Sequence, residues 1–459
     1  MGLSLKNIIV IGGGFAGLSA GTFLSEKGFQ VVVLEGRQMP GGRAYSFRDP
    51  QTHDSVDNGQ HLFMGCYHET RRFLERIGTI DLLQFQNNLS VDFVGNGGRE
   101  ARLGCLPLPA PLHILSGLFS LSTLSFNDRL RILKMRNALK QAISDPESAQ
   151  ALTIDQWLDQ CGQSEEVRRH LWDLIAIAAL NEDPSIASAW PFAVVLAQAF
   201  FGGRKESRLG FSTVGLSDLY VRAAKSFIEE KGGEIREKAP VERLVFEGNR
   251  VKSVVLRDGV RLSADWVISA VPAASLIRML PEGAFKKEPA FENIRRLKTA
   301  PIISIHLWFD RPISDKTFAG LLDTHIQWFF NKAKIHLDPE TSKGSVSLVI
   351  SGAHKFIEWP DKTILAMSME ELRRLFPAAR NAALVRWMII KENQATLSPE
   401  VGSEPLRPGH QTAYRNLLLA GDWTRTGLPA TIESACLSGH SCAAIIEKVE
   451  SGAEQLVLL

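Results

Sequence analysis

The chain of 459 residues has few cysteines, few tyrosines and almost no excess charge. Its 5 cysteines are scattered without a CxxC pair, which argues against a metal site or a disulfide framework and favours a reducing compartment. The net charge of +2 gives no reason to expect a nucleic-acid partner. No internal repeat or low-complexity linker is present. These absences leave a folded globular protein, 45% hydrophobic and 22% charged, whose length favours two domains.

The strongest pattern lies near the N-terminus, in residues 8–43. An uncharged run typical of a buried strand precedes a G-x-G-x-x-G motif, a helix of small residues and a second strand that ends in Glu35. Gly12 allows a tight turn, Gly14 lets a pyrophosphate approach the backbone, and Gly17 lets the helix pack closely on the strand. The phosphates are expected at the helix N-terminus, and an adenosine ribose is expected at Glu35. The residues predicted here to contact the cofactor are Gly12, Gly14, Phe15, Ala16, Gly17, Glu35, Gly36 and Arg37.

A second glycine turn, Gly41-Gly42-Arg43, follows six residues after Glu35. Its guanidinium near the same phosphates suits a long ligand such as FAD better than NAD. This arrangement resembles the GR2-type flavoproteins, which include amine oxidases and carotenoid desaturases.

Another loop, residues 56–63, contains Asp57, Gly59, Gln60 and His61. We expect Gly59 and Gln60 to approach a flat ring, with His61 over or beside it. The alternative is a loop histidine satisfied by backbone groups.

A matching anchor stands near the C-terminus. A buried strand at residues 417–420 leads into Gly421-Asp422, and a loop then feeds a helix that begins near Thr431. Asp422 is predicted to bind ribityl or pyrophosphate-side hydroxyls. The N–H groups of Thr431, Ile432 and Glu433 are predicted to face the electron-rich end of a flavin. We interpret the two ends of the chain as halves of one FAD site.

The middle of the chain alternates between helical and extended patterns. Residues 152–201 are mostly apolar and helical and would form walls for an apolar ligand. Strands between residues 234 and 270, with hairpin turns, would return the chain to the nucleotide domain, where Val241 would place a backbone group on the adenine. Residues 302–309 and 345–351 are predicted to form an antiparallel sheet that floors the substrate cavity.

Residues 103–127 carry no charge. Prolines break the first third, so a membrane span is not expected. We predict a helix at 112–126 whose apolar side enters lipid and whose cationic end, near Arg129 and Arg131, meets headgroups. The alternative is a helix that covers the core or lines a tunnel.

Five segments together resemble the squalene-associated branch of the flavin desaturase and amine oxidase superfamily. They are IGGGFAGLSA, GGRA, DNGQHLFMGCY, LPLPAPLH and AGDWTRTGLPATIESACLSG. The sequence departs from that family at Ser434, where relatives usually have glycine. The resemblance implies an α/β fold, in which a Rossmann-like FAD-binding domain of GR2 type is combined with a discontinuous α+β substrate domain. The expected ranges are 1–95, 215–298 and 393–459 for the FAD-binding domain, and 96–214 and 299–392 for the substrate domain.

The resemblance also implies a reaction: reductive dehydroxylation of hydroxysqualene to squalene by hydride transfer from reduced flavin. His61 is the candidate proton source, with Asp57 behind it; bound water is the alternative. The alternative functions are those of a carotenoid-type desaturase, a flavin amine oxidase and a flavin-binding protein without turnover. The expected partner is an isoprenoid lipid. No signal peptide fits before the first strand, so we expect a cytoplasmic protein, peripheral on the inner face of the cell membrane.

Overall fold

The computed structural model describes residues 6–337 and 343–452. At its centre is a five-stranded parallel sheet in the order β10-β2-β1-β14-β20. Its apolar strands are largely buried because helices and loops cover both faces. The sheet therefore contains strands from the N-terminal, middle and C-terminal parts of the chain. Because the strands are parallel, their carboxyl ends lie at the same edge of the sheet. The strands are β1 (Asn7–Ile11), β2 (Gln30–Leu34), β10 (Glu234–Arg236), β14 (Trp266–Ser269) and β20 (Leu417–Leu419).

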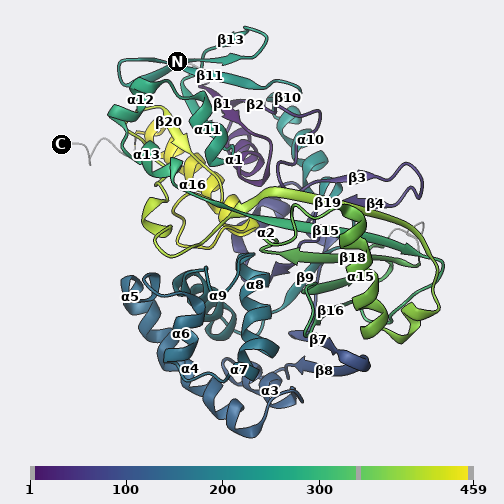
Figure 1. The fold of residues 1–459 in the computed structure, drawn as a ribbon. Helices are drawn as coiled ribbons and strands as arrows, with labels where there is room; N and C mark the ends of the chain where they lie inside the picture. Colours follow the sequence, from purple (N-terminus) through teal and green to yellow (C-terminus); the bar gives the residue numbers. More distant parts are fainter. Residues whose placement is uncertain (1–5, 338–342, 453–459) are drawn as a thin grey trace.

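Two helices from opposite ends of the chain pack against each other beside this sheet, α1 (Phe15–Glu26) and α16 (Ile432–Glu450) (Figure 1). They approach closely at Gly439, where an added Cβ would stand 2.1 Å from the Ala16 carbonyl oxygen. The Ser19 hydroxyl also donates to the Cys436 carbonyl across the contact, at 3.1 Å. This contact fixes the N-terminal ends of both helices relative to one another. Helix α10 (Arg222–Glu230) packs on α1 as well.

The predicted hairpins form a three-stranded antiparallel sheet, and a helical segment follows it. The sheet turns at Gly248, in the left-handed region with φ 58°. Its strands are β11 (Val241–Glu247), β12 (Arg250–Leu256) and β13 (Arg261–Leu262), and the helices are α11 (Ala273–Met279), α12 (Glu282–Lys287) and α13 (Ala290–Arg295).

A seven-stranded sheet in the order β19-β15-β18-β17-β16-β7-β8 confirms the predicted antiparallel floor; within it only the β16–β7 pair is parallel. Helix α15 (Asp361–Leu375) belongs to the same core. The domain division stays a prediction: its boundary after Gly95 falls between β7 and β8, and its boundary after residue 392 falls inside β19. The strands are β7 (Ser90–Gly95), β8 (Arg99–Gly104), β15 (Thr299–Phe309), β16 (Phe318–Leu321), β17 (Trp328–Asn331), β18 (Ser345–Ser351) and β19 (Leu384–Leu397).

A block of helices, blue in the lower part of Figure 1, fills the region between β8 and β9. The helix predicted at 112–126 is shorter in the structure: α3 ends at Ser120, and a new helix begins at Phe126. Ser120 ends α3 because its hydroxyl bonds to the β8 backbone, accepting from the Gly104 N–H at 3.0 Å, while Ser125 caps α4 by accepting from the Asp128 N–H. The helices are α3 (Leu112–Ser120), α4 (Phe126–Ser144), α5 (Pro146–Gln150), α6 (Ile154–Gln160), α7 (Glu165–Val167), α8 (Asp173–Leu180) and α9 (Ala189–Phe201).

Short strands and helices connect the two large sheets and the helical block. They are β3 (Ser46–Arg48), β4 (Ser55–Asp57), β5 (Phe63–Met64), α2 (His68–Arg76), β6 (Leu83–Phe85), β9 (Leu209–Ser212) and α14 (Lys332–Ile335). Within the described ranges, no helix has the length and apolar character needed to cross a membrane.

Gly439→Ala tests the α1–α16 contact. The new methyl group would meet the Ala16 carbonyl, so the helices must separate, and we expect the free energy of unfolding to fall by about 1–3 kcal/mol. Because both helix N-termini belong to the predicted FAD site, the FAD content of the purified protein should fall too. Thermal unfolding and the flavin-to-protein absorbance ratio measure the two effects.

Gly283→Ala is the matched control. Gly283 is also helical, but nothing lies within 4 Å of its added Cβ. This substitution should raise stability by about 0.5–1 kcal/mol. Equal effects of the two substitutions would contradict a close helix contact at Gly439.

Candidate functional site

A cavity of about 900 Å³ starts at the carboxyl edge of the parallel sheet and extends into the helical block. Its wall contains nearly every residue predicted to bind the cofactor, together with apolar residues of α3, α8 and α9. Two predicted residues are not in this wall. The predicted residues that line the cavity are Gly12, Gly14, Phe15, Ala16, Glu35, Gly36, Arg37, Gly42, Arg43, Gly59, Gln60, His61, Val241, Gly421, Asp422, Thr431, Ile432 and Glu433.

Gly17 is one of the two exceptions. A Cβ at Gly17 would stand 1.9 Å from the Gly12 carbonyl oxygen, so this position holds helix and strand together. Its contribution to the site is therefore close packing rather than ligand contact.

The N-terminus of α1 forms a cradle in the cavity wall. Gly14 precedes the helix and has no side chain to cap it, so first-turn N–H groups remain for an anion. The second glycine turn lies directly against the first: the Gly41 N–H donates to the Gly13 carbonyl at 2.8 Å, and a Cβ at Gly42 would be 3.1 Å from the Gly14 Cα. Two bare backbone segments thus meet at the place where a pyrophosphate needs close approach.

Glu35 is held at one end of this cradle. Its carboxylate accepts from the Gly13 N–H at 3.0 Å and from the Arg37 N–H at 2.8 Å. The side chain is buried, but it borders the cavity. Each carboxylate oxygen has a further acceptor position, which suits the hydroxyls of a ribose.

Arg43 and Asp422 form an ion pair across a sequence separation of 379 residues. Arg43 also donates to the Ala395 carbonyl at 3.2 Å. The pair joins the two glycine-bearing ends of the chain at the cavity wall and balances the charge of each partner.

Arg407 holds the same C-terminal loop from behind, and sequence reasoning missed it. Its buried guanidinium donates to the carbonyls of Asp422, Thr424 and Leu428 and pairs with Glu404. Only the surrounding fold reveals this role, because nothing in the local sequence of Arg407 distinguishes it from a surface arginine.

The start of α16 borders the cavity through Thr431, Ile432 and Glu433. Thr431 caps the helix by accepting from the Ser434 N–H at 3.2 Å. The Glu433 carboxylate is turned to α2, where it accepts from the Glu69 and Thr70 N–H groups, each at 2.9 Å. Burial raises the pKa of Glu433 against the lowering effect of these hydrogen bonds.

Asp57, predicted to lie behind His61, has Lys332 as its main partner. It is buried and outside the cavity wall, and its carboxylate accepts from Lys332 Nζ at 2.8 Å and from the Leu216 N–H at 3.0 Å. The Asp57–Lys332 pair forms because both groups are buried, and neither is stable there without an opposite charge. His61 itself lines the cavity.

Lys332 was not predicted, although it is the first cation after the aromatic run of β17. Its ammonium also donates to Gln60 Oε1 at 2.9 Å, so it fixes the amide of a residue in the cavity wall. Burial lowers the pKa of His61 below 6.5, Asp57 opposes this change and Lys332 adds to it. His61 is therefore a neutral imidazole at neutral pH.

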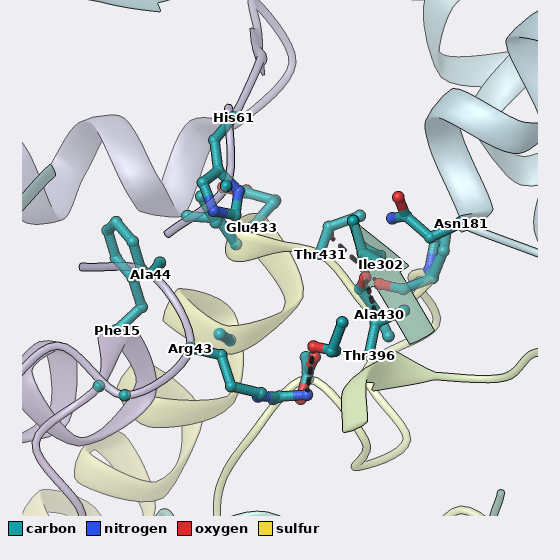
Figure 2. A pocket seen from close by; sticks show the side chains of 18 of the residues that line it. Phe15, Arg43, Ala44, His61, Asn181, Ile302, Thr396, Ala430, Thr431 and Glu433 are labelled. Atoms are coloured by element: carbon teal, nitrogen blue, oxygen red, sulfur yellow. Dashed lines mark hydrogen bonds and ion pairs between the residues drawn. The ribbon is translucent and has the colours of Figure 1, made fainter. Parts of the chain in front are cut away.

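These features fit FAD. The cradle of bare backbone, the buried Glu35 carboxylate beside it and the Gly59–His61 segment all line one cavity. These groups suit the pyrophosphate, a ribose and the flat ring system of one ligand. Figure 2 shows Phe15, Arg43, His61, Thr431 and Glu433 around this space.

Comparisons with known proteins agree with this fit. A family model described as flavin containing amine oxidoreductase matches residues 15–446. The chloroplastic 15-cis-phytoene desaturase of Capsicum annuum is 26% identical over 96% of this chain and 78% of its own. The hydroxysqualene dehydroxylase of Rhodopseudomonas palustris is 27% identical over 96% of this chain and 98% of its own. The solved cyclohexylamine oxidase of Brevibacterium oxydans superposes with a TM-score of 0.71 at 18% identity, covering 97% of this chain and 99% of its own.

The fold and the site define an α/β flavoprotein that binds FAD. The chain belongs to the flavin containing amine oxidoreductase family and is an FAD-dependent oxidoreductase.

Lys332→Met should destabilise the protein, because it leaves the Asp57 carboxylate buried without its cation. We expect a loss of about 3–5 kcal/mol near pH 8. In the wild type, burial raises the pKa of Asp57, but Lys332, His336 and hydrogen bonds outweigh it, and the pKa lies below 3.8. The stability from this carboxylate is thus present above pH 3.8 and constant between pH 8 and 5.

In the variant burial dominates, so the Asp57 pKa rises and the folded state gains a proton as the pH falls. The difference in the free energy of unfolding between wild type and variant, measured by chemical denaturation, should therefore become smaller from pH 8 to pH 5. The double variant Asp57→Asn/Lys332→Met is the control and should recover much of the loss. A gap that is independent of pH would show that the pair is not the cause.

Proposed function

We propose that the protein reduces hydroxysqualene to squalene with electrons from bound FAD. The observation that carries this proposal is the apolar far end of the cavity. Beyond the cofactor segments, the wall consists mainly of aliphatic and aromatic side chains, which suit a long hydrocarbon. Six of them are Leu103, Ile114, Leu118, Leu174, Ile175 and Leu196. Hydroxysqualene dehydroxylase is also among the relatives aligned over nearly their whole length.

The chemistry fits such a cavity. An allylic alcohol loses its hydroxyl as water once the oxygen is protonated, and reduced FAD, when bound, would supply the hydride that replaces it. The protein's part is to orient the chain, exclude water and provide a proton. His61 is our candidate proton donor, because it lies in the wall. Its imidazole is neutral at rest, so it takes up a proton from solvent before each turnover, and its lowered pKa makes that protonated form a stronger acid than free imidazole.

The main alternative is a carotenoid-type desaturase, which takes hydride from a polyene precursor with the same fold and cofactor. The similarity to 15-cis-phytoene desaturases supports it nearly as well. An amine oxidase is a weaker alternative, because the place where an aromatic guide is expected before Ile432 is taken by Thr431.

Anaerobic mixing separates these reactions. Enzyme with reduced FAD, mixed with hydroxysqualene, should reoxidise its flavin while squalene forms in equal amount. Oxidised flavins in general absorb near 450 nm, so absorbance at this wavelength measures reoxidation. Product chromatography measures the squalene formed. Absence of reoxidation, together with bleaching of oxidised enzyme by phytoene, would assign the desaturase reaction instead.

We also propose that α3 and α4 contact a membrane surface. Large apolar side chains are exposed on both helices, and on α4 they recur with helical spacing at Phe126 (63% exposed), Leu130 (44%) and Leu133 (39%). Exposed Arg131 and Lys134 lie beside them and match anionic headgroups. Residues of α3 also line the cavity, so a substrate dissolved in lipid has a short path inward.

Phe126→Ser/Leu130→Ser should weaken binding to vesicles that contain anionic lipid at least tenfold, because burying each large apolar side chain contributes about 1.5–3 kcal/mol. Vesicle co-sedimentation measures this. Val385→Ser is the control: Val385 is 70% exposed, but it lies on β19, away from this surface. Equal sedimentation of all three proteins would refute the proposal.

A further inference from the structure

Most polar side chains in the cavity wall already have partners within the protein. Gln60 Oε1 accepts from Lys332, Ser207 donates to the Arg204 carbonyl, and the Tyr67 hydroxyl is hydrogen-bonded to Thr431. The Thr396 hydroxyl donates to the Ala430 carbonyl at 3.5 Å. A neutral polar ligand group therefore has few places to bind.

Asn181 is different. It ends α8 in the left-handed region, with φ 54°, and it lines the cavity. Its Oδ1 accepts from the Ser351 hydroxyl at 2.8 Å. Among the described residues, Nδ2 donates to no protein group, so its N–H donors remain for a ligand. In Figure 2 the amide extends toward the space that His61 and Thr431 also border.

The backbone around Asn181 is held rigidly by the next residue. Glu182 is fully buried, and its carboxylate accepts from Ser398 Oγ at 2.6 Å and lies 2.9 Å from His354 Nε2. The loop also packs tightly on β18, since a Cβ at Gly352 would stand 3.4 Å from the Asp183 N. The Asn181 amide is thus fixed before any ligand arrives, which lowers the entropy lost on binding.

The register of the floor sheet relates Asn181 to the flavin end of the cavity. Ser351, its partner, pairs with Ile302 on β15. Ser304 lies two residues further on the same face, roughly 7 Å along the strand, and its hydroxyl is 3.4 Å from a Cβ placed on Gly59. Since Gly59 belongs to the segment expected against the flavin ring, Asn181 stands near the reacting end of the substrate and not at its hydrocarbon tail.

We propose that Asn181 is the substrate-binding residue that recognises an alcohol oxygen: its N–H donates to the hydroxyl of a long allylic alcohol. This rests on the proposed function and deepens it. The hydrogen bond orients the C–O bond toward the flavin side and stabilises the oxygen as the bond breaks, while the proton comes from another group. A pure hydrocarbon makes no such bond, so Asn181 distinguishes an alcohol substrate from a polyene.

Equilibrium binding to the oxidised holoenzyme tests this without turnover. Hydroxysqualene and squalene are titrated in detergent, and the change in flavin absorbance gives each Kd. The wild type should prefer the alcohol about tenfold, the size of one neutral hydrogen bond. Asn181→Gly keeps the left-handed backbone and removes the amide, so the preference should disappear while the Kd for squalene stays within about twofold.

Two further variants make the outcome decisive. Ser351→Ala loosens the amide and should reduce the preference about threefold; it decides the question if Asn181→Gly loses FAD. Gln198→Leu removes another amide from the same wall and should keep the preference. If the wild type binds squalene as tightly as the alcohol, the role of Asn181 is overturned, whereas the proposed function fails only if hydroxysqualene does not reoxidise the reduced flavin. If the wild type prefers the alcohol and both Asn181→Gly and Ser351→Ala do so equally, the role of Asn181 is overturned and the function stands.

Discussion

The close contact between α1 and α16 is the constraint on which the rest of the structure depends. Gly439 lets α16 approach the Ala16 carbonyl, and the bond from Ser19 to Cys436 fixes the approach. Both helix N-termini then border the same cavity, so the donors at two ends of the chain are available to one ligand. The Arg43–Asp422 ion pair closes the arrangement. A site made from such remote segments exists only in the folded chain, and its stability is therefore coupled to cofactor binding.

Buried charged side chains near the cavity are paired with an opposite charge or surrounded by hydrogen-bond donors. Asp57 pairs with Lys332, Arg43 pairs with Asp422, and Glu182 is surrounded by donors. Removing one partner of such a pair costs far more than the pair contributes, so these groups are mutually obligatory. Only the Arg43–Asp422 pair lines the cavity itself; the other two groups lie outside its wall, where they fix the segments that carry Gln60 and Asn181.

The glycine motifs were predictable because local turn geometry and close packing require glycine at these positions. The two halves of the FAD site were inferred from these motifs. The parallel strands and the floor sheet were likewise predictable from apolar runs. Arg407, Lys332 and Asn181 were not, because the function of each depends on partners far away in sequence. The main partner of Asp57 was not predictable for the same reason: the sequence neighbour His61 was considered, whereas the carboxylate accepts a hydrogen bond from the distant cation Lys332.

The direction of electron flow is not a property of this fold. Relatives named for desaturation and for dehydroxylation align over similar shares of the chain, at 26% and 27% identity. Both reactions need the same flavin and the same apolar cavity, and both pass hydride between flavin and a substrate carbon. They differ at the polar end of the substrate, where one ligand has a leaving oxygen and the other has only carbon. One fixed N–H donor at the polar end of the substrate is enough to favour one of them, because its energy is gained only when an oxygen is there to accept it.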